Sequence, residues 1–363
     1  MSHNKRIVVK IGTKVITSGD RALDKDSIGQ IARQIADMQD KGAKVILVTS
    51  GAIGAGMWLL HMKKRPSDLG SLQAAASIGQ SRLMHLYGEY FKARGYLVGQ
   101  ILLTQEDFND RKRYLNIKHT ISALLANGVI PVINENDTVA TDEIRCGDND
   151  RLSSLVADAC GADLLVILTD IDGLLDERGN VVREVGEVTP QILKLGGKSR
   201  CDLGTGGMAT KLESARNVTH AGIGCVIANG KEKDVLLRIM NGEEIGTTFL
   251  TGKARFIAKK RWIAFSSRPK GMIIIDDGAA LALKKKNKSL LASGIAGVDG
   301  NFIAGDVIGI AGKDGKEFAR GVANYASDDL AKIKGIKTSG FKNILGYKGP
   351  DEVVHKDNLV ILR

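Results

Sequence analysis

Two apolar runs near the start of the sequence indicate the type of fold: Ile7-Val8-Val9-Lys10-Ile11 and Val45-Ile46-Leu47-Val48. Each run is short and apolar, as is typical of a buried strand. Between the two runs, apolar residues recur at helical spacing and a glycine then ends the pattern. These residues are Ile28, Ile31, Ile35, Met38 and Gly42. The stretch therefore predicts a strand, a helix and a second strand.

The same alternation continues to about residue 250. Apolar runs predict further strands at residues 97–103, 129–133, 164–168 and 225–228. Amphipathic stretches predict helices at roughly 71–94, 111–126, 149–160 and 207–221. Strands that are apolar nearly throughout and alternate with helices indicate a parallel sheet covered on both faces. We therefore predict an α/β fold, a three-layer α-β-α sandwich with a mainly parallel sheet.

The last third of the chain differs in charge and in pattern. Residues 253–363 carry 21 Lys and Arg against 11 Asp and Glu, so nearly all of the net charge of +11 lies there. Short apolar runs at 272–275, 306–311 and 318–322 are separated by turn signals such as Asp299-Gly300 and Asp314-Gly315. They predict a small β-barrel-like unit with a helix or two. The expected division is a first domain at 1–252, a linker at 253–269, irregular from Trp262 to Pro269, and a second domain at 270–363.

Composition narrows the class of protein. No run of about 18 apolar residues could cross a bilayer, and no apolar leader precedes the first strand. The four cysteines are widely spaced without a C-x-x-C pattern, so reduced thiols and a cytoplasmic location are expected. The six histidines form no ligand-like cluster in the sequence, which leaves metal-dependent hydrolysis without support.

The segment Gly204-Thr205-Gly206-Gly207-Met208-Ala209-Thr210-Lys211 has the composition of an anion site. It offers exposed backbone N–H groups, hydroxyls and an ammonium at the start of a predicted helix, where the helix dipole favours negative charge. It is not a Walker A loop, and its resemblance to a dinucleotide fingerprint lacks the preceding strand and the later acidic residue. The alternative is a flexible turn before a helix.

Polar residues follow several of the predicted strands, at the sheet edge where open α/β folds bind ligands. Lys10 ends the first strand, and Gly12 after it lets the backbone approach a phosphate; the alternative is a solvated lysine on an edge strand. Val48-Thr49-Ser50-Gly51 leaves the second strand as a floor for a ligand or as a plain packing turn. Asn134-Glu135-Asn136-Asp137 and Gly147-Asp148-Asn149-Asp150 could hold an ammonium group or Mg²⁺, or could be solvated turns. Thr169 and Asp170 end another strand.

These loops resemble the glutamate 5-kinase family of the amino acid kinase superfamily. The similarity covers essentially the whole chain and includes Gly79-Gln80-Ser81-Arg82 and Leu102-Leu103-Thr104. The last segment resembles a PUA domain, a module named after RNA-modifying enzymes, through Gly271–Asp276, Gly305-Asp306-Val307 and Ala319-Arg320-Gly321. The sequence departs from the family after Asp170, where Gly173-Leu174-Leu175-Asp176 lacks the usual tyrosine and the later proline that would contact the nucleotide base.

The resemblance implies an enzyme that phosphorylates the side-chain carboxylate of L-glutamate with ATP and Mg²⁺, at the start of proline synthesis. Such a carboxylate, with a pKa of about 4.3, is already ionised near neutral pH, so no general base is required. Proline is implied as an inhibitor and a homo-oligomer as the assembly. The alternatives are a kinase for aspartate or an acylated glutamate, and an RNA-binding protein.

The resemblance also implies which residues form the site. The implied catalytic residues are Lys10, Asp150 and Lys211. The residues implied to hold glutamate are Ser50, Gly51, Asp137 and Asn149. Those implied to hold ATP are Lys10, Thr169, Asp170, Thr205, Gly206, Gly207, Met208, Ala209, Thr210 and Lys211. The metal ligands stay unknown.

Overall fold

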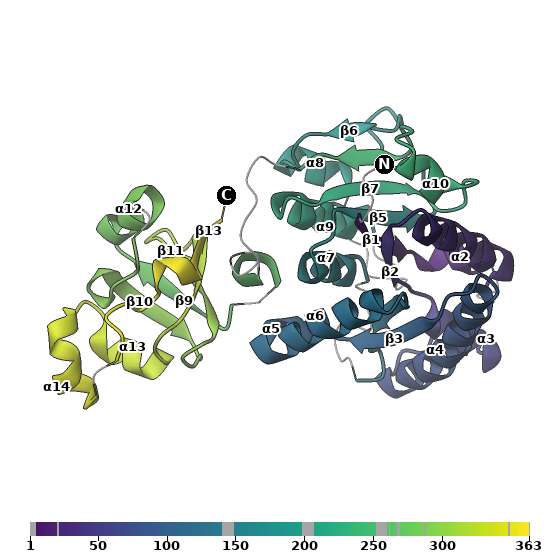
Figure 1. Ribbon diagram of the computed structural model, residues 1–363. Helices are drawn as coiled ribbons and strands as arrows, with labels where there is room; N and C mark the ends of the chain where they lie inside the picture. Colours follow the sequence, from purple (N-terminus) through teal and green to yellow (C-terminus); the bar gives the residue numbers. More distant parts are fainter. Residues whose placement is uncertain are drawn as a thin grey trace. The chain divides into compact units, whose positions relative to one another are not determined.

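A computed structural model describes residues 5–19, 22–139, 149–197, 207–251, 260, 262–266, 269–286, 288–347 and 349–362. The contacts within the chain divide it into two compact units, Met1–Arg255 and Phe256–Arg363. Each unit has its own sheet and its own apolar core (Figure 1). Most of the predicted linker 253–269 lies outside the described residues.

The first unit is built on an eight-stranded sheet in the order β3-β4-β2-β1-β5-β7-β8-β6. The six strands from β3 to β7 in that order are parallel, whereas β8 runs antiparallel to β7 and carries β6 at the edge. This confirms the mainly parallel sheet. The bounds are β1 Arg6–Ile11, β2 Lys44–Val48, β3 Val98–Leu103, β4 Ile130–Glu135, β5 Leu164–Thr169, β6 Glu184–Val185, β7 Gly224–Asn229 and β8 Thr247–Phe249.

Helices cover both faces of this sheet, as predicted (Figure 1). On one face α2, α4 and α10 share a core with the sheet, and α3 packs on α4. On the other face lie α6, α7 and α9, with α5 and α8 beside them. The bounds are α1 Thr13–Ile16, α2 Lys25–Asp40, α3 Ala52–Leu59, α4 Leu69–Lys92, α5 Gln105–Asn109, α6 Arg111–Ala126, α7 Asn149–Cys160, α8 Pro190–Leu195, α9 Met208–His220 and α10 Val235–Met240.

Strand geometry assigns Lys10 to one of these layers. Ile7, Val9 and Ile11 belong to the core that β1 shares with α2 and α4. Because successive side chains of a strand point to opposite faces, Lys10 points to the other layer, where α7 packs against β1. The strand lies in the middle of the sheet and Lys10 is buried, so the alternative of a solvated edge-strand lysine is wrong.

The second unit contains a five-stranded mixed sheet in the order β10-β9-β11-β12-β13, with β9 and β11 parallel. Its core includes Ile273, Ile310 and Leu330. The bounds are β9 Gly271–Ile275, β10 Ile295–Gly300, β11 Val307–Ala311, β12 Glu317–Val322 and β13 Leu359–Ile361, with α12 Asp277–Lys286, α13 Ser327–Ile333 and α14 Phe341–Leu345.

Two sequence interpretations of the second unit need correction. Asp299 and Gly300 end strand β10 instead of forming a turn between strands, although Gly300 has a φ of +83° that lets the chain turn immediately afterwards. The segment expected to be irregular contains a π-helical turn at Trp262–Ser266, and Trp262 and Ile263 are buried. Packing of these apolar residues gives the segment an order that its sequence does not reveal.

Candidate active site

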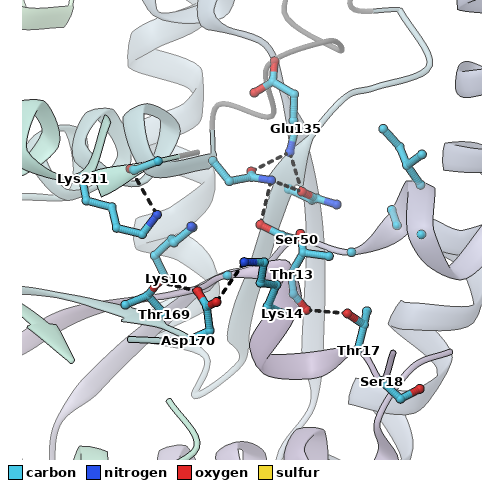
Figure 2. A pocket seen from close by; sticks show the side chains of 18 of the residues that line it. Lys10, Thr13, Lys14, Thr17, Ser18, Ser50, Glu135, Thr169, Asp170 and Lys211 are labelled. Carbon is cyan, nitrogen blue, oxygen red and sulfur yellow. Dashed lines mark hydrogen bonds and ion pairs between the residues drawn. The ribbon is translucent and has the colours of Figure 1, made fainter. Parts of the chain in front are cut away.

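A cavity of about 680 Å³ lies at the carboxyl ends of β1, β2, β4 and β5. The polar residues that follow these strands line it together, although they are up to 160 residues apart in the sequence (Figure 2). Segment 207–211, at the start of α9, closes another side. Among the lining residues are Lys10, Gly12, Lys14, Ser50, Gly51, Arg65, Asn134, Glu135, Asp137, Asn149, Thr169, Asp170, Gly207, Met208, Lys211 and Lys231.

Two buried lysines share one buried carboxylate beside the cavity. Lys10 Nζ, at the end of β1, lies 2.5 Å from Asp150 Oδ1. Lys211 Nζ, in the first turn of α9, lies 3.1 Å from Asp150 Oδ2. The ammonium ends of both lysines point to the same part of the cavity (Figure 2). The structure therefore brings together the three residues that the sequence singled out as catalytic.

Asp150 is held in place and in its charged form. Its side chain is only 1% exposed, and the Thr210 hydroxyl lies 2.7 Å from Oδ2. Burial alone would raise the pKa of this carboxyl, but the charges of Lys10 and Lys211, together with the hydrogen bonds from Lys10 and Thr210, outweigh burial and lower it. Two positive charges against one negative charge leave this cluster with an excess of one, which suits it to an anion in the cavity.

A set of buried amides forms the neighbouring wall. Asn149 Nδ2, at the start of α7, donates to Ser50 Oγ at 3.1 Å and to Asn134 Oδ1 at 3.0 Å. Asn134 Nδ2 donates to Gln80 Oε1 at 2.8 Å. The backbone N–H of Glu135 donates to the side-chain oxygens of Asn134 and Asn149, at 2.9 and 3.3 Å. Ser50 and Asn149 thus belong to one network.

Glycines make this wall possible. Gly51 precedes α3 with a φ of +93°, a conformation that L side chains rarely adopt, and its turn directs the chain from β2 into the helix. α3 and α4 approach so closely that a Cβ on Gly79 would lie 1.8 Å from the carbonyl oxygen of Ala52. This backbone contact lies one residue before Gln80 and two residues after Ser50.

Asp137 and Arg65 both line the cavity, and their charges interact. Asp137 is half-buried, and burial raises the pKa of its carboxyl to about 6, while the charge of Arg65 acts in the opposite direction. The carboxyl is poised for a cation, because a positive group that arrived in the cavity would favour its ionised form.

The opposite end of the cavity is formed by the ends of β1 and β5 and by the start of α9. The Gly12 N–H donates to Leu168 O at 2.9 Å, and a Cβ on Gly12 would lie only 3.2 Å from that oxygen. Lys14 Nζ pairs with Asp170 Oδ2 at 2.9 Å, and this pair is partly exposed. Gly207 and Met208 line the cavity with Thr169.

Not every residue proposed from the sequence can be placed. Thr205 and Gly206 lie outside the described residues, as does Asp148. Ala209 and Thr210 belong to α9 but do not line the cavity, and Thr210 contacts Asp150 instead. Sequence reasoning left out Lys14, Arg65, Asn134, Glu135 and Lys231 as site residues, although Asn134 and Glu135 stand inside a segment that it did single out.

Metal ligation and membrane insertion can be addressed for the described part of the chain. There, no three His, Cys, Asp or Glu side chains gather as a metal cluster would require. Over the same residues, the structure contains no helix with the length and apolar character of a membrane span. Cys160 and Cys225 are buried free thiols.

Comparison with known proteins identifies the family to which the chain belongs. Residues 5–229 match the amino acid kinase family, and residues 271–345 match the PUA domain. Over 69% of this chain and 100% of the other, the fold resembles the carbamate kinase from Giardia lamblia bound to AMP-PNP, with a TM-score of 0.51. At 17% identity this likeness concerns the fold alone. The chain therefore belongs to the amino acid kinase family and carries a C-terminal PUA domain.

Relatives of nearly the same length define the group within that family. The glutamate 5-kinase of Caldanaerobacter subterraneus subsp. tengcongensis is 49% identical, and the alignment covers 98% of both chains. The glutamate 5-kinase of Moorella thermoacetica is 46% identical over 100% of this chain and 97% of the relative. These matches confirm the resemblance drawn from the sequence motifs, and the protein is an enzyme of the glutamate 5-kinase group.

Proposed function

We propose that this enzyme transfers the γ-phosphoryl group of ATP to the side-chain carboxylate of L-glutamate and gives L-glutamyl 5-phosphate and ADP. The observation that carries the proposal is the Lys10–Asp150–Lys211 cluster, whose excess positive charge borders the cavity. The near full-length similarity to enzymes named glutamate 5-kinase supports the choice of acceptor.

The chemistry requires charge control and no proton transfer. A carboxylate oxygen of glutamate forms a bond to the γ-phosphorus while the bond from that phosphorus to the bridging oxygen breaks, and ADP leaves with the electron pair. Both reactants are anions, so the main tasks are positioning and electrostatic stabilisation. Lys10 and Lys211 would neutralise the moving phosphoryl oxygens. Asp150 would keep both ammonium groups charged and aimed at one point.

The amide wall and Asp137 suit the acceptor. Ser50 and Asn149 both border the cavity; Ser50 offers a hydroxyl that Asn149 orients by donating to it, and Asp137 offers a carboxylate for the α-ammonium group of glutamate. The side-chain carboxylate of an acceptor held between them could then extend toward Lys10. This arrangement favours an acceptor with a free amino group.

The opposite end of the cavity suits the nucleotide. The N-terminus of α9 with Gly207 and Met208, together with Thr169, Asp170 and Lys211, would bind the ATP phosphates. Kinases often hold Mg²⁺ with nucleotide phosphates, waters and only one or two carboxylates, so the lack of a cluster of three in the described residues fits Mg²⁺ carried by ATP. Asp170 would be its protein ligand, directly or through water. When bound, the metal would neutralise phosphate charge.

An acceptor screen tests the proposal. The full-length enzyme would be incubated with ATP, Mg²⁺ and glutamate, aspartate or N-acetylglutamate, and acyl phosphate would be trapped with hydroxylamine. We expect hydroxamate from glutamate far above that from the other two acceptors. Hydroxamate from aspartate or N-acetylglutamate alone would assign the enzyme to another acceptor. No hydroxamate from any acceptor, in a protein that binds RNA in a salt-dependent manner, would favour the RNA-binding alternative.

Inhibition by proline is the second part of the proposal. Proline carries a carboxylate and a charged amine, so it could occupy the part of the cavity near Asp137 and compete with the α-carbon end of glutamate. Activity at subsaturating glutamate should fall with millimolar proline and recover when glutamate is raised. Unchanged activity across that titration would remove proline as a regulator of this enzyme.

A further inference from the structure

A chain of hydrogen bonds in the amide wall has a direction that can be established without ambiguity. A backbone N–H can only donate, so the atom of Asn134 that receives the N–H of Glu135 must be its oxygen. The nitrogen of Asn134 therefore faces Gln80, at 2.8 Å, and the facing atom of Gln80 must be Oε1. The same backbone N–H also fixes Asn149, whose oxygen it meets at 3.3 Å.

The donor-to-acceptor direction of these hydrogen bonds also determines the role of Ser50. With its oxygen toward Glu135 N, Asn149 uses Nδ2 to donate to Asn134 Oδ1 and to Ser50 Oγ, at 3.0 and 3.1 Å. Ser50 Oγ is thus an acceptor from the protein. Its own proton is left to donate, and the side chain borders the cavity. The network consequently presents Ser50 as an O–H donor, which is the polarity that an anion in the cavity requires.

Gln80 lies at the far end of this chain and does not line the cavity. It is buried in α4, and its Nε2 has no hydrogen-bond partner among the residues that the structure describes. A buried donor without a partner is costly, and a leucine or methionine would fill the same space without that cost. The retained amide is explained by its other atom, Oε1, which receives the Asn134 side chain.

We propose that Gln80 is a positioning residue: its Oε1 holds the amide nitrogen of Asn134 while the backbone N–H of Glu135 holds the oxygen, and Asn134 with Asn149 then keeps Ser50 as a hydrogen-bond donor to the anionic acceptor. The inference rests on the proposed function, because that function supplies a carboxylate in the cavity. The close contact between α3 and α4 supports it, since Gly79, next to Gln80, meets the backbone of Ala52, two residues after Ser50. Loss of Oε1 would leave Asn134 held on its oxygen side alone, with its buried amide nitrogen without the Gln80 acceptor, and would weaken the order of the network.

The test is a double-mutant cycle on the full-length enzyme. Gln80→Met keeps length and volume but removes the acceptor, Ser50→Ala removes the donor, and the double variant removes both. The readouts are kcat and KM for glutamate and for ATP in the hydroxamate assay, with thermal melting to verify folding. Gln80→Glu is the rescue variant, because its carboxyl offers an acceptor to Asn134 in either protonation state. Gln30→Met, on an exposed position of α2, is the matched control.

A hydrogen bond to a charged group is commonly stronger than a neutral one, so we expect Ser50→Ala to lower kcat/KM for glutamate by about 10- to 100-fold. Gln80→Met should lower it by about 10-fold with the KM for ATP unchanged, and Gln80→Glu should recover most of this loss. In the Ser50→Ala background, Gln80→Met should have little further effect. Gln30→Met should behave as wild type.

Other outcomes separate this inference from the proposed function. Fully additive losses in the double variant, or equal losses for Gln80→Met and Gln80→Glu, would mean that Gln80 acts by packing alone and would overturn the inference. Equal changes in the KM for ATP and for glutamate would do the same. A wild-type enzyme that forms no hydroxamate from glutamate would instead overturn the proposed function, and with it the anion that this inference requires.

Discussion

At the scale of single residues, Lys211 provides the sharpest test of the lysine–aspartate cluster. Its ammonium is one of two that face Asp150, and the other, Lys10, stays in place when Lys211 is removed. We expect Lys211→Ala to fold and to lose about 10²- to 10³-fold in kcat, the range found for preorganised electrostatic groups. Steady-state kinetics and circular dichroism would measure this. Lys64→Ala, in an exposed loop, serves as the control, and a folded Lys211→Ala protein with near-normal kcat would contradict the role.

The raised pKa of the Asp137 carboxyl predicts that glutamate binding depends on pH. Burial raises the pKa of its carboxyl to about 6, so the group is mostly neutral below that pH and mostly charged above it. Only the charged form can pair with the α-ammonium group. We therefore expect kcat/KM for glutamate to be level above about pH 7 and to fall by up to about 10-fold per unit below pH 6, because one proton blocks binding.

Saturating glutamate should reduce this pH effect, since the bound ammonium group favours the carboxylate form and kcat then changes less than kcat/KM. Asp137→Asn is the control variant: it should bind glutamate weakly and show no step near pH 6. If wild type and Asp137→Asn have the same pH profile, another group titrates and the assignment of Asp137 fails.

Residue chemistry made part of the site predictable. Two patterns indicated functional residues: a lysine inside an apolar strand, and a second lysine in a glycine-rich segment at the start of a helix. Neither pattern stabilises the fold by itself, so each predicted a role in binding or catalysis. Asn134 stands in a polar segment that was singled out and Gln80 in a stretch that resembles the family, but the sequence did not indicate the contact between these two side chains. Their partners stand 15 and 54 residues away in the sequence, and only the crossing of β4 with α4 and α7 brings these amides together.

At the scale of elements, the contact between α3 and α4 determines the geometry of the amide wall. A Cβ on Gly79 would lie 1.8 Å from Ala52 O and 2.5 Å from Gly56 N, both backbone atoms that cannot move aside separately. We expect Gly79→Ala to lower the free energy of unfolding by about 1–3 kcal/mol, as overpacking does, and to reduce kcat/KM for glutamate because Ser50 and Gln80 separate.

Gly88 is a matched control on the same helix. A Cβ there would meet only Val98 Cγ2 at 4.0 Å. Gly88→Ala should therefore raise the free energy of unfolding by up to about 1 kcal/mol through helix propensity and leave activity unchanged. Urea denaturation and the hydroxamate assay would distinguish the two variants. Equal stabilities for Gly79→Ala and Gly88→Ala would show that the two helices can separate without cost.

The predictability of elements followed their length and pattern. All six parallel strands were predicted from sequence because each is a nearly continuous apolar run. β6, β8 and β13 were not, since a strand of two or three residues carries no periodicity and is formed by pairing with a neighbour. β10 was also missed, because Gly297, Asp299 and Gly300 interrupt its apolar pattern. α3 is apolar on every side and therefore lacks the 3.6-residue period that revealed α2.

At the scale of the whole molecule, the order of the sheet could not be predicted although its class could. Alternating strands and helices indicate parallel pairing, but the positions of β1 and β5 at the centre depend on long crossovers whose lengths do not specify a neighbour. The reversed edge consists of β6, which precedes α9 in the chain, and β8, which follows α10. These two strands have only two and three residues and left no sign in the apolar pattern. The two-unit organisation was signalled by charge, because the excess of basic residues begins near residue 253.

The two units should also unfold separately in calorimetry of the full-length chain. Each has its own sheet and apolar core, so two transitions are expected in place of one. The cavity belongs to the first unit, and a ligand that binds only the folded state stabilises by about 2.7 kcal/mol at 100 times its Kd. ATP should therefore raise the melting temperature of one transition by several degrees and leave the other unchanged. Lys211→Ala should weaken this shift. A single transition that moves as a whole with ATP would show that the units unfold as one cooperative body.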